Sequence, residues 1–112
     1  SESELAAVKR RRNLASAAKR YLERHFRENL RLEDLAEELK VSSFHLSRIF
    51  SSESEFSLFE YLTELRMNEA KKLLRDGRHT VSDVAQMVGY DNGNYFAKVF
   101  RKRIGIPPSH FR

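Results

Sequence analysis

Arginine, lysine and amide side chains stand at two places in the sequence where they can read the edges of base pairs. The first place is Ser43–Arg48 and the second is Asn94–Lys98. Arg48 can donate two hydrogen bonds to guanine O6 and N7, and Asn94 can pair with adenine N6 and N7. Such side chains read a sequence only when a rigid element carries them into a groove, so the elements that hold them decide the interpretation.

The composition favours a compact, basic domain. The chain has 112 residues, of which 40% are hydrophobic, and its 21 Lys and Arg outnumber its 16 Asp and Glu. Basic domains attract nucleic-acid phosphates, although the same charge also serves solubility. The excess is larger in residues 57–112 than in residues 1–56. A separate basic run, Lys9–Arg12, has a solvated helix start or a linker as its alternative interpretation.

The sequence contains no pattern typical of an enzyme, a metal site or a membrane-spanning segment. Cys is absent, which removes disulfides and thiolate ligands and fits a reducing, cytoplasmic location. The four His are scattered without metal-ligand spacing. There is no Gly-rich phosphate loop, no recognisable Ser–His–acid set and no apolar run long enough to cross a bilayer. We therefore expect no enzyme, no cofactor, no bound metal and no membrane association.

Helical spacing of apolar residues runs through nearly the whole chain, which predicts an all-α fold. Gly77 and Gly105-Ile106-Pro107-Pro108 are expected to end helices, and Ser42 and either Asp91 or Asn92 to begin them. The expected helices cover about residues 8–29, 33–39, 43–52, 58–75, 82–88 and 92–103, with the first turn of another at 109–112. The 58–75 helix is expected to bury an apolar face that includes Phe59, Met67 and Leu74.

An internal repeat organises these helices. Leu32–Leu39 and Val81–Val88 share an apolar, Asp, apolar, Ala, apolar pattern at an offset of 49, and one extra residue in the second turn makes the offset 50. The matched pairs are then Leu46 with Phe96, Arg48 with Lys98, and Phe50 with Phe100. Each copy reads as a short helix, a tight turn and a second helix. This is the pattern of a helix-turn-helix unit, whose second helix can lie in a major groove.

The sequence resembles the DNA-binding domain of the AraC/XylS family of bacterial transcription regulators over about residues 12–112. The resemblance is carried by Leu35-Ala36, Ser42–Phe50, Tyr61-Leu62, Leu65–Met67, Ala70–Leu74, Val84–Tyr90, Tyr95-Phe96, Phe100–Lys102, Gly105–Ser109 and Phe111-Arg112. It implies about seven helices in two helix-turn-helix subdomains, residues 8–56 and 77–112, joined by a long central helix at 57–76. It also implies that two recognition helices enter successive major grooves of double-stranded DNA. The family includes activators that touch RNA polymerase, and some repressors.

We expect base contacts from residues on the outer faces of the two recognition helices. The candidates are Ser43, Phe44, Ser47, Arg48, Asn94 and Lys98. Phe44 can pack on thymine methyl groups, or can instead be a core residue between the subdomains. Gly93 and Ala97 are small where many family members carry more polar residues, so the second unit is expected to read fewer bases.

A further group of polar residues is expected to contact the DNA backbone. These are Ser42, His45, Asn92, Tyr95, Arg101, Lys102 and Arg103. Helix capping is the alternative for Ser42 and Asn92, and a hydrogen bond to nearby backbone is the alternative for His45. A solvated surface is the alternative for the basic residues at 101–103. Arg66 is left open between the DNA backbone and a pair with Glu69 or Asp34.

The predicted function is sequence-specific DNA binding that regulates transcription, with activation as the expected direction. The rival is a helical protein-interaction module with only non-specific DNA affinity, and Arg48, Asn94 and Lys98 argue against it. RNA binding is disfavoured because the aromatic-bearing sheets of common RNA modules are missing. We expect a monomer on DNA, with dimers formed through a missing N-terminal domain. The operator, the effector and the direction of regulation are not encoded in any motif.

Overall fold

The structure is a computed structural model that describes residues 1–111. These residues form six α-helices and one short 3₁₀ helix, and the described part of the chain contains no strand. The all-α prediction is therefore confirmed, with six α-helices where about seven were expected. The chain packs as two units, Ser1–His25 with Leu30–Leu62 and Phe26–Asn29 with Thr63–Arg112. The predicted subdomain limits at residues 56 and 77 stay a prediction.

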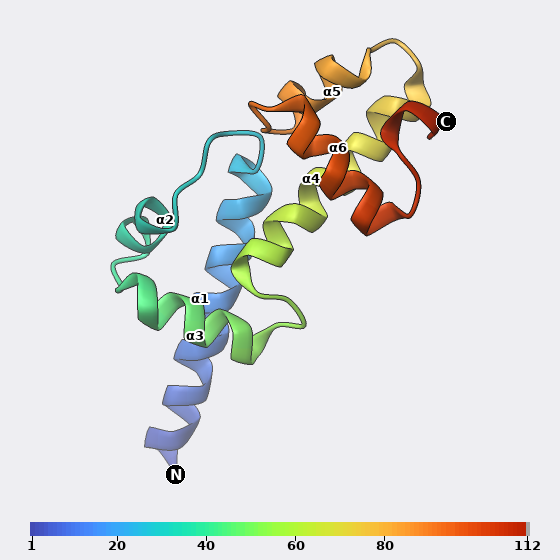
Figure 1. The fold of residues 1–112 in the computed structure, drawn as a ribbon. Coiled ribbons are helices and arrows are strands. Elements are labelled where there is room, and N and C mark those ends of the chain that lie inside the picture. Colours follow the sequence, from blue (N-terminus) through green and yellow to red (C-terminus); the bar gives the residue numbers. More distant parts are fainter. Residues whose placement is uncertain (112) are drawn as a thin grey trace. The chain divides into compact units, whose positions relative to one another are not determined.

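The first unit contains three complete helices and the first turn of a fourth. They are α1 (Glu2–His25), α2 (Leu32–Glu38), α3 (Ser43–Glu53) and the start of α4 (Leu58–Asp76). In this unit α1 and α2 both pack against α3 (Figure 1). Leu46 and Phe50 of α3 are completely buried, and Leu22 and Leu35 on the two partner helices are nearly so. Burying these side chains, each worth about 1.5–3 kcal/mol, holds α3 in place while its other face stays in solvent.

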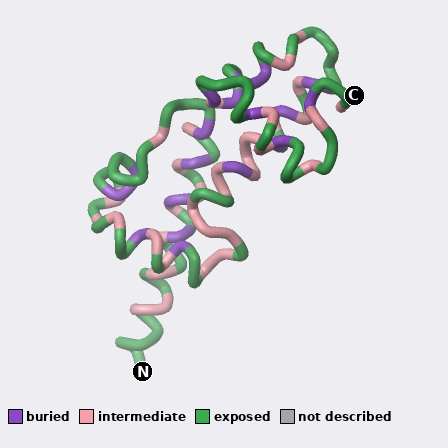
Figure 2. The backbone as a smooth tube through the Cα atoms, in the orientation of Figure 1, coloured by how far each residue is buried: buried purple, intermediate pink, exposed green. Residues whose placement is uncertain are grey.

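The second unit contains the rest of α4, then α5 (Val81–Met87), α6 (Gly93–Ile104) and the 3₁₀ helix η1 (Pro108–His110). Its core combines aliphatic residues of α4 and α5 with a row of aromatic rings. In this row Tyr90–Phe96, Phe96–Phe100 and Phe100–Phe111 have centroid distances of 5.5, 5.8 and 5.4 Å. Aromatic pairs at such distances add to the hydrophobic stabilisation. Figure 2 shows the buried positions recurring along the helices as short segments between exposed ones.

The first helix differs from its predicted limits at both ends. It begins at Glu2 rather than near residue 8, because the Ser1 hydroxyl accepts the N–H of Glu4 at 3.2 Å and nothing in the first residues breaks a helix. It ends at His25 rather than near residue 29, because the next segment serves the second unit. There, Arg66 takes the carbonyl oxygens of Phe26 and Glu28 at 2.8 and 2.9 Å.

Two smaller expectations are also wrong. Phe59 was placed on the buried face of α4, but its side chain is 66% exposed. It lies in the first turn of α4, at the rim of an apolar hollow that also involves Leu30 and Leu32. The chain end expected to start an α-helix at residue 109 instead forms the short 3₁₀ helix η1, with Pro107 as its N-cap and Pro108 as its first residue. Arg112, part of that expectation, lies outside the described residues. The limits of the other α-helices differ from the prediction by at most one residue at each end.

Candidate nucleic-acid interface

The turn of each helix-turn-helix is built by the same backbone motif. After α2, the N–H of Val41 donates to the carbonyl of Ala36 at 3.0 Å. After α5, the N–H of Tyr90 donates to the carbonyl of Ala85 at 2.9 Å. In both turns the preceding residue has a positive φ, +60° at Lys40 and +105° at Gly89. This is a Schellman motif, which ends a helix and reverses the chain within a few residues. The sequence repeat is therefore a structural repeat.

The recognition helices begin in the same way in both units. Ser42 Oγ accepts the N–H of His45 at 3.1 Å, and Asn92 Oδ1 accepts the N–H of Tyr95 at 3.0 Å. Both residues have extended backbones and each satisfies an amide that the helix itself leaves unpaired. The predicted caps at Ser42 and Asn92 are confirmed. Their predicted contacts with the DNA backbone stay a prediction, and these contacts must coexist with the capping bond.

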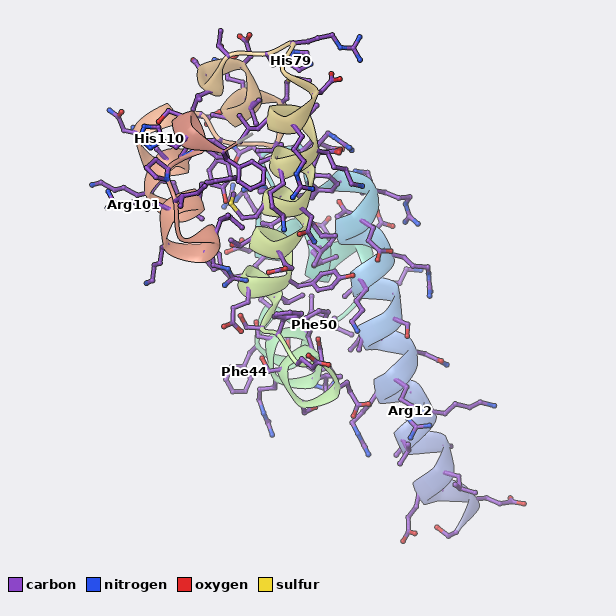
Figure 3. The ribbon with its side chains drawn as sticks, turned by 90° about the vertical axis from the view of Figure 1, so that its right-hand side faces the viewer. Arg12, Phe44, Phe50, His79, Arg101 and His110 are labelled. Carbon is purple, nitrogen blue, oxygen red and sulfur yellow. The ribbon has the colours of Figure 1, made fainter. Side chains whose placement is uncertain are left out.

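The outer face of α3 presents an aromatic ring and a guanidinium to solvent. Phe44 is 73% exposed, so it takes no part in the core of the first unit. Figure 3 shows Phe44 pointing outward, whereas Phe50 of the same helix points into the unit. The Arg48 guanidinium carbon lies 5.6 Å from the Phe44 ring centroid, a cation–π contact that limits the positions of both side chains. His45 is exposed one residue further along, and Ser43 and Ser47 are half-buried.

The outer face of α6 includes two small residues among its polar and aromatic ones. Gly93, Asn94, Tyr95 and Lys98 are exposed and Ala97 is half-buried. The Tyr95 ring lies 5.9 Å from the ring of Tyr90, which ties the first turn of α6 to the turn before it. Asn94 and Lys98 lie one helical turn apart and project from the same side of the helix.

The three basic residues at the end of α6 are exposed, and one of them forms an ion pair. Arg101 and Lys102 are exposed, and Figure 3 shows the Arg101 side chain projecting away from the unit. Arg103 donates from Nη2 to Glu64 Oε2 at 2.7 Å, so its guanidinium already has a carboxylate partner. A phosphate contact by Arg103 would have to share or replace this ion pair. The three residues also stabilise the carbonyl end of α6 through the helix dipole.

Arg66 has a structural role that the sequence did not indicate. It donates to two carbonyl oxygens after α1, and its guanidinium carbon lies 5.1 Å from the Tyr90 ring centroid. The carboxylate of Glu69, one of the partners considered for it, pairs instead with Arg27. Burial raises the pKa of Tyr90, and the charge of Arg66 opposes that rise. Arg66 thus holds the turn of the second helix-turn-helix in place.

The acid–base groups of the two units belong to the scaffold. Burial and a 2.9 Å hydrogen bond to Glu23 raise the pKa of Tyr61 to about 12. The Arg78 guanidinium lowers the pKa of the exposed Asp76 carboxyl. Residues 1–111 contain no cluster of three or more potential metal-ligating side chains. None of the helices among those residues is long and apolar enough to cross a membrane.

Comparison with known proteins places this arrangement in a family. A family model described as a helix-turn-helix domain matches residues 35–112. The chain belongs to the AraC-type helix-turn-helix family of transcription regulators. The C-terminal domain of AraT, a response regulator from Geobacillus stearothermophilus, superposes with a TM-score of 0.85 and 36% identity, covering 88% of this chain and 83% of that one.

Two further proteins are similar to this chain over most of its length. The bifunctional transcriptional activator/DNA repair enzyme AdaA of Bacillus subtilis is 36% identical over 92 residues, which are 82% of this chain and 44% of AdaA. The DNA-binding domain of AdpA, solved in complex with a target DNA, has a TM-score of 0.79 over 85% of this chain and 86% of that one. Its 23% identity makes this a likeness of fold. The chain spans less than half the length of the curated relatives that it matches.

Proposed function

We propose that this chain binds double-stranded DNA sequence-specifically through α3 and α6, each in one of two successive major grooves. The observation that carries the proposal is the repeated device of a Schellman turn, a side-chain cap and a helix with one buried and one exposed face. A single exposed helix would be weak support, because many helical proteins contain one. Two copies of the same device, in a basic chain of the AraC-type family, favour reading of two DNA segments.

The two units are proposed to contribute unequally to specificity. On α3, Arg48 supplies a bidentate donor for guanine and Phe44 an apolar contact for a thymine methyl group, with Ser43 and Ser47 beside them. On α6, Asn94 and Lys98 are the two side chains that can reach base edges. Gly93 and Ala97 contribute no polar group. We therefore expect the motif read by α3 to carry more sequence information than the motif read by α6.

Contacts to phosphates would fix the register of each helix without reading sequence. His45 and Tyr95 stand in the first turns of α3 and α6, and Arg101 and Lys102 at the end of α6. These four side chains are exposed and are the strongest of the predicted backbone contacts.

In the full protein this domain is proposed to activate transcription, with RNA polymerase as a partner and dimerisation outside the present chain. Its contribution is binding, not catalysis, and a protein acting on a bacterial chromosome works in the cytoplasm. The name of AdaA combines transcriptional activation with DNA repair, so a relative of this chain can have an enzymatic activity in addition to DNA binding.

The experiment is selection of this chain's preferred sites from a randomised duplex pool at two salt concentrations, followed by sequencing. Two enriched motifs about one helical turn apart, roughly 34–36 Å along the duplex, would support the proposal. Salt-sensitive binding without an enriched sequence would reduce the chain to a basic helical module. Absence of binding at low salt would favour the protein-interaction alternative.

A further inference from the structure

The recognition helices do not account for the basic run Lys9–Arg12 of α1. It lies in the middle of a regular helix, where successive residues point about 100° apart. The four side chains therefore cannot share one face. Arg10 and Arg11 line surface hollows that they share with α3, whereas Lys9 and Arg12 do not line them. Figure 3 shows Arg12 on α1 well away from Phe44.

Two hollows connect Arg10 and Arg11 with the recognition helix of the first unit. One is lined by Arg11 together with Phe44, Ser47 and Arg48, the face expected to read bases. The other is lined by Arg10 and Arg11 together with His45, the expected phosphate contact of α3. Arg11 belongs to both hollows. Arg10 and Arg11 of α1 thus lie beside the exposed face of α3, and α1 packs directly against α3.

The charge of Arg11 is only weakly satisfied within the protein. Its Nε lies 3.9 Å from Glu53 Oε2, which is too long for a hydrogen bond, and its side chain is 42% exposed. Ion pairs of this kind contribute between nothing and about 1 kcal/mol in water. A phosphate group offers a stronger, bidentate partner for the same guanidinium. Arg10 is exposed.

We propose that Arg10 and Arg11 form a second DNA-binding surface, which holds the phosphates flanking the groove that α3 enters. This inference rests on the proposed function, and it extends the contact of the first unit from one helix to two. Its occupant is the DNA backbone, because two guanidinium groups beside a base-reading face complement phosphate charge and carry no sequence information. The last turn of α3 has no basic residue, whereas the last turn of α6 has Arg101, Lys102 and Arg103. Arg10 and Arg11 supply the first unit with the cations that the end of its recognition helix lacks.

The test compares two double variants with the same loss of charge on the same helix. Arg10→Ala/Arg11→Ala removes the proposed surface, and Lys9→Ala/Arg12→Ala is the matched control. Each phosphate contact contributes about 0.9 to the slope of log K against log salt concentration. The Arg10→Ala/Arg11→Ala slope should therefore be shallower by roughly 2. Between about 50 and 200 mM salt, wild-type affinity should then fall roughly tenfold further than the variant's.

Two further measurements keep the result specific to phosphate binding. Arg10→Lys/Arg11→Lys keeps the charge and should restore most of the slope, while Glu53→Gln breaks the Arg11 ion pair without removing a cation and should leave the slope unchanged. A duplex cut at the outer edge of the first motif should lower wild-type affinity and leave Arg10→Ala/Arg11→Ala unaffected. Equal effects of the two double variants, or no effect of either, would overturn the inference. Failure of the wild-type chain to select any motif would instead overturn the proposed function.

Discussion

Replacing Gly89 with alanine tests how the turn of the second helix-turn-helix is held. Gly89 has a φ of +105°, which costs an L-residue roughly 1–2 kcal/mol. A Cβ there would lie 2.9 Å from the carbonyl oxygen of Phe26 and 3.0 Å from Cζ and Nε of Arg66. That carbonyl and Arg66 share a 2.8 Å hydrogen bond, whose loss costs about 1.5–3 kcal/mol because one partner is charged. We expect a total destabilisation of about 2.5–5 kcal/mol.

Gly105 provides a matched control for this prediction. Its φ is +100°, and a Cβ there would meet nothing within 4 Å. Gly105→Ala should therefore show the backbone cost alone, about 1–2 kcal/mol. The assay is urea unfolding followed by circular dichroism for both variants. Equal losses at the two positions would refute the role given to the Arg66 contacts.

At the same turn position of the first unit, Lys40→Gly should stabilise the protein by up to about 1 kcal/mol, because Lys40 has a φ of +60°.

Three further outcomes are expected. Arg48→Ala should lower the binding free energy for the selected site by about 1–3 kcal/mol and relax the sequence preference. Lys102→Ala should weaken binding to all duplexes alike and flatten the salt dependence. Equal loss of affinity for Arg48→Ala on selected and random DNA would contradict base reading. Ser42→Ala and Asn92→Ala should each lower stability by about 1 kcal/mol in thermal melts, and an unchanged Tm with lost DNA affinity would assign them to phosphate contact instead. Because the folded pKa of Tyr61 is raised to about 12 from 10.0, its contribution to stability is complete below pH 10 and is lost as the pH rises toward 12; in unfolding titrations Tyr61→Phe should flatten this alkaline fall, and an unchanged profile would count against it.

The features that could be predicted from the sequence depend on neighbouring residues. The repeat placed both turns correctly, because helix caps and apolar periodicity act within a few residues. Ser42 was identified as a cap, and its 3.1 Å hydrogen bond confirms it. Asn92 was one of two candidates, and its 3.0 Å hydrogen bond decides the choice. The exposure of Phe44 also followed from the helical spacing of Leu46 and Phe50.

The features that were missed depend on partners far away in the chain. The end of α1 at His25 follows from Arg66, which binds carbonyls 40 and 38 positions earlier in the sequence. Arg103 looks like a free cation in the sequence, yet it pairs with Glu64, 39 residues earlier. The division of the basic run Lys9–Arg12 into two faces likewise needs the position of α3 against α1. Such pairings leave no periodic signal in a single sequence.

The central claim is that α3 and α6 each read their own segment of DNA. It is tested most directly by measuring equilibrium binding of wild-type, Arg48→Ala and Asn94→Ala chains to the selected site and to two derivatives, each with one motif scrambled. The account predicts that Arg48→Ala loses affinity on the intact site but nothing further where the motif of α3 is scrambled. Asn94→Ala should behave in the same way toward the motif of α6. If both variants lose affinity equally on all three duplexes, the two helices do not read separate segments and the account is wrong.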